Sequence, residues 1–215
     1  MGFDMFPASM SSVKASKHDR VLQIYRIVAL VVSIGSMAYM MGDDGVVGFI
    51  EVLFNWKVVA GVIFYLLATL AYFVDKLDKP ACLAYLVAWT LIWPLTIFDW
   101  VIVDQANSLS PIDIFTVEGI DLYCGYVFPV LLILIDYVLN RICFVREQYS
   151  VPVVIAIILV FVLSLPLEST LETLMGALLL PLRIIIIVTG LIFLEIGRVI
   201  KARSCSNSAL DQHLL

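Results

Sequence analysis

Two ionisable side chains inside long apolar stretches are the residues of this chain that could do chemistry. Arg183 lies near the middle of one stretch, and Asp136 lies well inside another. Ionisable residues inside a membrane are costly and are candidate functional residues by default. One interpretation is a polar pocket in which Arg183 holds an anionic headgroup or a carboxylate. The other, which we favour, is a structural clasp between two helices, because pairing offsets the cost of removing each charge from water.

Histidine, the most common metal ligand and general base, is scarce. Both histidines, His18 and His213, lie in the terminal segments, outside every long apolar stretch. The four cysteines are scattered, without a closely spaced pair. Membrane haem sites usually take histidine, and zinc sites need clusters of histidine or cysteine. The sequence therefore predicts no catalytic residue, no metal and no cofactor.

The last five residues of the chain resemble a sorting signal. Asp211, Leu214 and Leu215 are spaced as in the Asp-x-x-Leu-Leu sorting signals that clathrin adaptors read. Such a signal is read by a receptor and does not anchor the protein. It requires a cytosolic tail, and it implies a Golgi, endosomal or lysosomal protein, or one that cycles through the plasma membrane.

The elements that position these residues follow from composition. The chain is 62% hydrophobic and 14% charged, with a mean hydropathy of +1.05. A soluble domain is about 45–50% apolar and about 25% charged, and one of this size could not bury so much apolar surface. The net charge of -5 and pI of 4.9 argue against nucleic-acid binding. These values exclude a soluble enzyme, a nucleic-acid binder and a disordered chain.

Apolar stretches of membrane-spanning length give the predicted architecture. A helix needs about 20 mostly apolar residues to cross a bilayer. The sequence predicts an all-α polytopic membrane protein with tails at 1–20 and 201–215 and a membrane domain at 21–200. The six predicted spans are 21–41, 57–74, 81–103, 123–144, 151–167 and 174–197.

The distribution of Lys and Arg predicts the orientation. With six spans both termini lie on one side, and eleven of the thirteen basic residues fall on that side. Basic residues favour the cytosolic side, so both termini are predicted to be cytosolic. The exceptions are Lys57, at the opposite interface, and Arg183, inside a span. Asp99 and Glu195 lie near span ends, and we expect their carboxylates to reach water.

Several motifs resemble those of a known family. The segments VLFNWKVVAGVIFY, VDKLDK, TLIWPLTIF and GYVFPVLLILIDYVL fall in order between about residues 53 and 163. They resemble the six-span androgen-induced family, which includes the androgen-dependent regulator of tissue factor pathway inhibitor. Members of this family are membrane hydrolases of fatty acid esters of hydroxy fatty acids. The resemblance implies a fold of six membrane-spanning helices that faces lipid substrates.

The positions that would carry the family's chemistry are changed. The family's nucleophilic Thr corresponds to Phe54, and its catalytic His corresponds to Cys124. A hydroxyl nucleophile needs a neighbouring base, and neither group is present at these positions. The resemblance therefore implies a relative that has lost hydrolysis.

Three functions remain in competition. The first is a non-enzymatic accessory protein, scaffold or subunit that binds membrane lipids or other membrane proteins, favoured by the absence of catalytic groups. The second is a lipid hydrolase of the androgen-induced type with altered catalytic residues. The third is a small-solute transporter, suggested by Arg183, Asp136 and the prolines inside spans.

Overall fold

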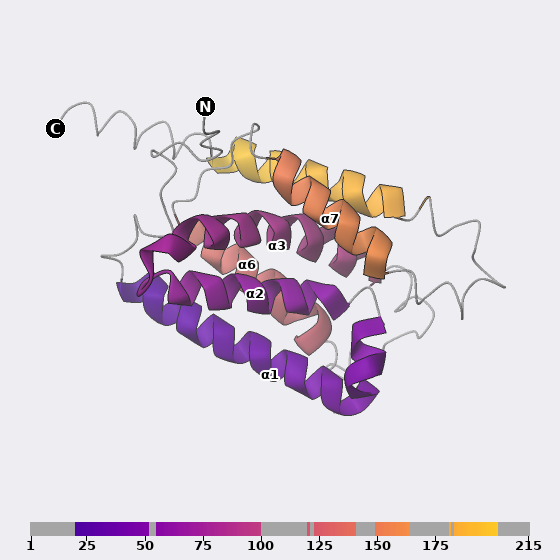
Figure 1. The fold of residues 1–215 in the computed structure, drawn as a ribbon, viewed down its shortest axis with the longest axis horizontal. Coiled ribbons are helices and arrows are strands. Elements are labelled where there is room, and N and C mark those ends of the chain that lie inside the picture. Colours follow the sequence, from indigo (N-terminus) through magenta and orange to yellow (C-terminus); the bar gives the residue numbers. More distant parts are fainter. Residues whose placement is uncertain are drawn as a thin grey trace.

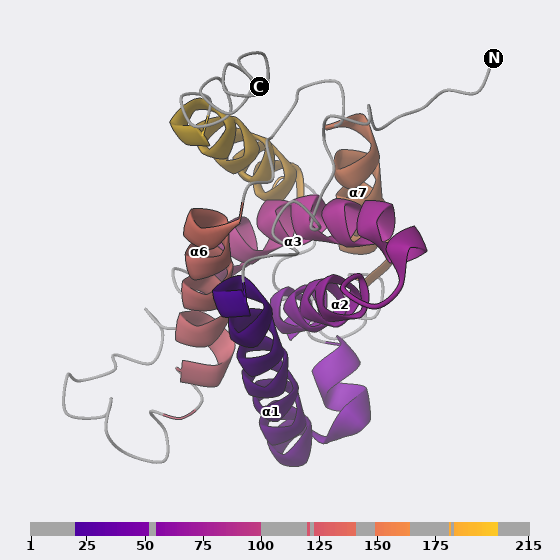
Figure 2. The ribbon, with the colours of Figure 1, turned by 90° about the vertical axis from the view of Figure 1, so that its left-hand side faces the viewer.

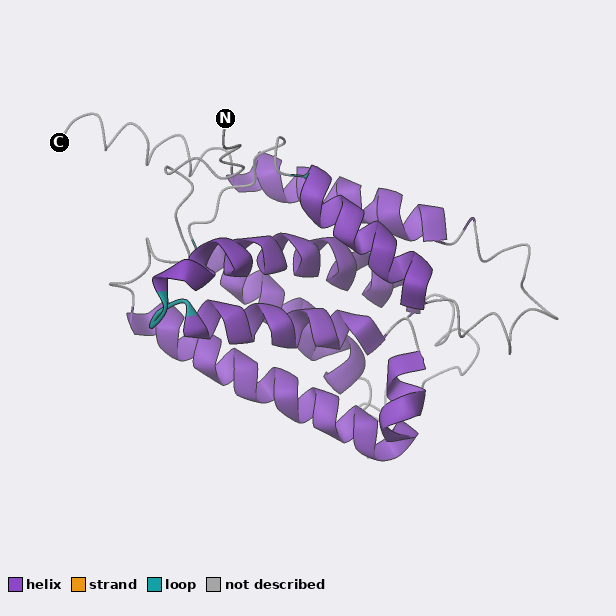
Figure 3. Ribbon diagram, in the orientation of Figure 1, coloured by secondary structure: helices purple, strands orange, loops and turns teal. Residues whose placement is uncertain are grey.

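The computed structural model describes residues 20–51, 55–99, 120, 123–140, 149–163, 181 and 183–201. Over these residues the chain is helical and contains no strand (Figure 3). The prediction of an all-α fold is confirmed. Two helical stretches in this part of the chain, Arg20–Gly42 and Asp75–Asp99, are long and apolar enough to cross a membrane.

The first two helices form an antiparallel hairpin. α1 (Arg20–Glu51) bends at Gly45, where φ is 73°. Glycine adopts this left-handed conformation without the steric penalty that a Cβ imposes. α2 (Trp56–Leu70) then runs back along α1 (Figure 1). The Asn55 side chain donates a hydrogen bond of 3.2 Å to the Phe49 carbonyl, which fixes the chain before α2 begins.

A short connection leads from α2 to the central helix. The 3₁₀ turn η4 (Asp75–Leu77) precedes α3 (Asp78–Asp99). Asp78 lies in the first turn of α3, where a negative charge interacts favourably with the helix dipole. Pro80 also lies in that turn, where the missing N–H is not needed. Pro94 lies inside α3, so it removes one hydrogen-bond donor from the helix.

The described residues of the second half of the chain, from 120 onward, form three further helices. The π-helical turn η7 (Tyr123–Val127) continues into α6 (Phe128–Leu139), followed by α7 (Ser150–Leu163) and a helix at residues 183–201. α6 ends at Leu139 because Asn140 is extended, with φ -80° and ψ 163°. The predicted fourth span, which continued to residue 144, is therefore too long as a helix. The last helix continues to Lys201, beyond the predicted end at 197.

α3 lies at the centre of the bundle. Figure 2 shows α3 between α2 and α6 on one side and α7 and the 183–201 helix on the other. Aromatic side chains fill the interior: Phe64 lies 4.7 Å from Tyr65 and 4.9 Å from Tyr85, and Trp89 lies 4.7 Å from Tyr137, measured between ring centroids. Residues from α1, α2, α3, α6, α7 and the last helix share this core.

The last helix approaches α3 very closely. A Cβ placed on Gly190 would lie 2.5 Å from the Thr90 carbonyl oxygen, so only glycine fits there without a shift. This carbonyl is the one whose helical donor Pro94 removes, being four residues before it. Trp89 also donates a hydrogen bond of 2.9 Å to the Phe193 carbonyl, and the Trp93 and Phe193 rings stack at 5.0 Å. These contacts hold the last helix against α3.

Candidate functional site

The centre of one polar site is a buried ion pair between α1 and α6. Arg26 Nε donates to Asp136 Oδ2 at 2.9 Å, and Arg26 Nη2 donates to Asp136 Oδ1 at 3.2 Å. Both side chains are 0% exposed. The guanidinium also lies over the Phe64 ring, 5.9 Å from its centroid. This bidentate geometry is the strongest form of a charge-assisted hydrogen bond and fixes the two helices in register.

Two further residues extend this pair to the last helix. The Asn140 side-chain amide donates to Asp136 Oδ1 at 2.6 Å. Lys201 Nζ donates to the Asn140 backbone carbonyl at 2.8 Å and to Asn140 Oδ1, and it lies 4.6 Å from the Tyr137 ring centroid. We call Arg26, Asp136, Asn140 and Lys201 the Asp136 cluster. It joins the beginning of α1, the end of α6 and the end of the last helix.

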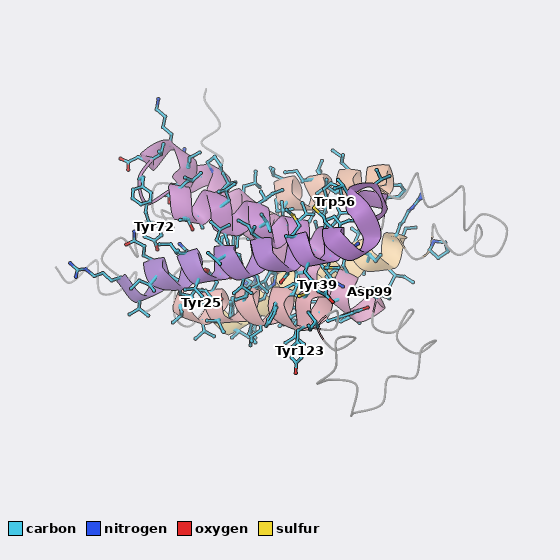
Figure 4. The ribbon with its side chains drawn as sticks, turned by 90° about the horizontal axis from the view of Figure 1, so that it is seen from below. Tyr25, Tyr39, Trp56, Tyr72, Asp99 and Tyr123 are labelled. Carbon is cyan, nitrogen blue, oxygen red and sulfur yellow. The ribbon has the colours of Figure 1, made fainter. Side chains whose placement is uncertain are left out.

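A second buried ion pair lies at the opposite end of the bundle. Lys57 Nζ, in the first turn of α2, donates to Asp99 Oδ2, in the last turn of α3. The ammonium also lies 4.1 Å from the Tyr126 ring centroid in η7. We call these two residues the Lys57 pair. Figure 4 shows the separation of the two ends, with Tyr25 and Tyr72 near one and Trp56 and Asp99 near the other.

The predicted pair of Arg183 and Asp136 is wrong. Asp136 is satisfied by Arg26 and Asn140. Lys201 contacts Asn140, so the Asp136 cluster lies at the end of the last helix, and Arg183 lies 18 residues earlier, about 27 Å along its axis. Arg183 is buried, and its guanidinium lies 5.4 Å from the Phe161 ring centroid.

The two acidic residues near span ends behave differently from each other. We expected the Asp99 carboxylate to reach water, but Asp99 is buried against Lys57. Glu195 is about one-third exposed and pairs with Arg198, one helical turn later, at 2.7 Å. Sequence reasoning missed Arg26, Lys57 and Lys201 as site residues because each lies near a span end, where a long side chain normally reaches water.

Of the two positions that matched the catalytic residues of the androgen-induced family, the structure describes one. Phe54 lies outside the residues that the structure describes. Cys124 is buried in η7, which packs against α1 and α6. The residues of the predicted sorting signal, Asp211, Leu214 and Leu215, also lie outside the described residues.

An apolar groove lies on another face of the bundle, between α2, α3 and α7. Its volume is about 300 Å³, and Cys124 does not line it. Along α2 the lining runs from Trp56 to Leu67, about 16 Å at the rise of an α-helix. The lining side chains are aliphatic apart from Trp56, and they are Trp56, Val59, Ala60, Ile63, Leu67, Pro80, Leu83, Ala84, Val87, Leu91, Ile155 and Leu159.

Comparison of the chain with protein-family models, with curated proteins and with solved structures finds no match.

Proposed function

We propose that this chain is a non-enzymatic membrane protein of six spans that binds the acyl chain of a membrane lipid in the groove between α2, α3 and α7. The groove carries the proposal. Its volume of about 300 Å³ falls at the lower end of ligand pockets, which hold about 300–1,000 Å³. Apart from Trp56 its lining is aliphatic, and it offers dispersion contacts and no charged group that would bind a charged substrate.

The length of the groove matches one leaflet. The hydrocarbon core of a bilayer is about 30 Å thick, so the chains of one leaflet occupy about 15 Å. The groove extends about 16 Å along α2. An occupant in contact with hydrocarbon on its open side must itself be apolar, since an unsatisfied polar group there is expensive. An acyl chain of one leaflet has the length of the groove and is apolar, so it meets both requirements.

The proposed orientation places both termini in the cytosol. Eleven of the thirteen basic residues support it, together with the acidic character of the loops on the other side. The Asp136 cluster would then lie toward the cytosol and the Lys57 pair toward the other face. Protease protection of terminal tags, before and after selective permeabilisation of the plasma membrane, tests this orientation. We expect both tags to be digested only after permeabilisation. Digestion of either tag in intact cells, or protection of either tag after permeabilisation, would contradict it.

Lipid co-purification tests the groove. Ala84 lines it, and a Phe at this position would fill it. Val138, on α6, is 72% exposed and does not line the groove, so Val138→Phe is a matched control. After purification in mild detergent, native mass spectrometry of the unaltered protein should show retained lipid. We expect Ala84→Phe to lose several-fold of this lipid and Val138→Phe to keep it. Equal retention by both variants would overturn the proposal.

The hydrolase alternative predicts a reactive Cys124, in place of the family's His. A thiolate nucleophile needs a lowered pKa and access, and Cys124 is buried in η7 and does not line the groove. Labelling with a fluorophosphonate or a thiol-reactive lipid probe, with Cys124→Ser as control, distinguishes the two functions. We expect no labelling that depends on Cys124. Labelling that disappears in Cys124→Ser would favour the hydrolase.

For localisation, we propose an endomembrane protein, or one at the plasma membrane, whose tail binds clathrin adaptors through Asp211, Leu214 and Leu215. The proposal rests on the spacing of these residues and on a cytosolic C-terminus. Deletion of Leu214 and Leu215 should shift a tagged protein toward the cell surface of a eukaryotic cell. Unchanged distribution in surface biotinylation would contradict it.

A further inference from the structure

We propose that the groove between α2, α3 and α7 binds a phospholipid of the cytosolic leaflet, with Lys76 beside the phosphate of its headgroup. This inference rests on the proposed function, because it assigns the headgroup, the leaflet and the direction of the lipid whose acyl chain fills the groove. The lining of the groove contains no charged side chain. The charges that select a headgroup must therefore lie just beyond one of its two ends.

One end of the groove lies where α2 ends and α3 begins. Leu67 lines it three residues before the last residue of α2, and Pro80 lines it two residues after the first residue of α3. The turn that contains η4 joins the two helices there (Figure 1). Lys76 lies in this turn and Lys79 directly precedes Pro80, and both lysines are exposed. In the proposed orientation this end of the groove faces the cytosol.

The helical period of α3 places Lys76 on the face that lines the groove. The lining residues of this helix recur at spacings of three and four and so share one face; they are Pro80, Leu83, Ala84, Val87 and Leu91. Lys76 lies four residues before Pro80 in one continuous helical stretch, Asp75–Asp99, so it continues this face by one turn toward water. A lysine at this position can lay its apolar stem along the groove and hold its ammonium at the level of the lipid phosphates.

The acidic residues of the same turn lie on the opposite face of the helix. Asp78 is two residues before Pro80, which is about half a helical turn. It is four residues before Cys82, which is 5% exposed, belongs to the core and does not line the groove. Asp75, three residues before Asp78, shares this face. The groove face therefore ends in a cation, which suits the phosphate of a phospholipid.

The other end of the groove does not suit a phosphate. Trp56 lines it, and the next residue, Lys57, is 0% exposed, does not line the groove and is paired with Asp99. The Lys57 ammonium also lies 4.1 Å from the Tyr126 ring centroid. A phosphate here would meet the negative charge of Asp99 and would have to break a buried ion pair, which is costly. We therefore expect the headgroup at the Lys76 end and the end of the acyl chain near Trp56.

The first test measures headgroup preference by native mass spectrometry. The delipidated protein is offered equal amounts of dioleoyl phosphatidic acid and dioleoylglycerol, which differ only in the phosphate. We expect the unaltered protein to retain phosphatidic acid in preference, and Lys76→Met to lose about fivefold of this preference, the usual effect of one lysine near an anionic surface. Lys76→Arg should keep the preference. Arg20→Met is the matched control, because Arg20 is an exposed cation at the start of α1 and does not line the groove.

The outcomes separate this inference from the proposed function. An equal loss of preference in Lys76→Met and Arg20→Met would overturn the inference, since the preference would then follow overall charge. Equal retention of the two lipids by the unaltered protein would overturn it too, while leaving the acyl-chain site in place. Failure to retain either lipid would overturn the proposed function as well.

The second test measures the direction of the lipid and needs no variant. Two phosphatidic acids carry a diazirine either near the carboxyl end or near the methyl end of the acyl chain, and their adducts on the unaltered protein are mapped by mass spectrometry. We expect the carboxyl-end probe to label Leu67 and Leu83, and the methyl-end probe to label Val59 and Leu91. The reverse pattern would place the headgroup beside Lys57 and overturn the inference. The same adducts from both probes would also overturn it.

Discussion

The Asp136 cluster and the Lys57 pair are both buried ion pairs, yet they are built differently. Asp136 accepts hydrogen bonds from Arg26 and from Asn140, deep inside the bundle, and the cluster joins helices whose residues are 110 positions apart. The Lys57 pair joins the adjacent helices α2 and α3, 42 positions apart, at their ends. The first connects α1 to α6, two helices that are far apart in the sequence. The second reinforces a hairpin that other contacts already hold.

The cations of the two ion pairs also differ in their chemistry. The guanidinium of Arg26 is planar and always charged, so it needs its carboxylate in place. The ammonium of Lys57 is carried on a flexible stem in the first turn of α2, where it can reach water if its partner is lost. We therefore expect the two ends to respond very unequally to the loss of a carboxylate.

The largest expected effect is that of Asp136→Ala. It leaves the Arg26 guanidinium, now 0% exposed, without a counter-charge. Breaking a buried pair from one side costs about 3–5 kcal/mol of unfolding free energy. We expect poor expression and a strongly reduced thermal midpoint. Glu195→Ala is the control, since the pair of Glu195 with Arg198 is partly exposed and screened by water, so we expect little change in the thermal midpoint. If both variants behave like the unaltered protein, the Asp136 cluster has no structural role.

The second effect is that of Asp99→Ala, which removes the carboxylate of the Lys57 pair. We expect a loss of about 2 kcal/mol, because one charged hydrogen bond disappears while Lys57 can turn toward the aqueous interface. The double variant Lys57→Met, Asp99→Leu should recover most of the lost thermal midpoint, since apolar replacement of a buried pair is often neutral. A loss as large as that of Asp136→Ala would remove the contrast between the two ends.

The third effect separates the outer part of the Asp136 cluster from its centre. Lys201→Met keeps an apolar stem but loses the hydrogen bonds to Asn140. We expect the thermal midpoint to fall by an amount equivalent to about 1–2 kcal/mol, with the Arg26–Asp136 pair intact. Combined with Asp136→Ala, the variant should show a non-additive loss. Strict additivity would mean that Lys201 and Asp136 act independently.

The smallest expected effect concerns a neutral hydrogen bond between the same two helices. Tyr137 donates to the Gly197 carbonyl at 2.8 Å. Tyr137→Phe keeps the ring that packs on Trp89 and removes this bond, so we expect a loss of about 1 kcal/mol in a thermal unfolding measurement. Tyr149→Phe removes two longer bonds, of 3.2 Å to the Leu194 carbonyl and 3.4 Å to Glu195 Oε2, and should lose less. The reverse order would show that bond length does not report strength at this contact.

Much of the fold was predictable from the sequence because hydropathy reports where helices lie. The helices α2, α3 and α7 begin within three residues of the predicted spans. The ends of helices were less predictable: α6 stops at the extended Asn140, and the apolar residues Ile142, Cys143 and Phe144 that follow extended the predicted span past the polar Asn140-Arg141 pair. The bend at Gly45 is a backbone feature that hydropathy does not report.

The candidate sites were only partly predictable. Asp136 was identified because a carboxylate inside an apolar run is conspicuous, but its partner was assigned incorrectly to Arg183. Arg26 lies inside the predicted first span, six residues after Arg20, and that position was a usable signal. The groove could not be predicted, because its residues are ordinary aliphatic side chains and only the packing of α7 against α2 and α3 leaves space between them.

The measurement that tests the central claim most directly is photolabelling in lipid vesicles. A phosphatidylcholine with a diazirine in its acyl chain would be crosslinked to the reconstituted protein, and the adducts mapped by mass spectrometry. We predict adducts concentrated at groove residues such as Ile63 and Val87, well above those at the exposed α1 residue Val31. Adducts spread evenly over all lipid-facing residues would contradict a specific acyl-chain site.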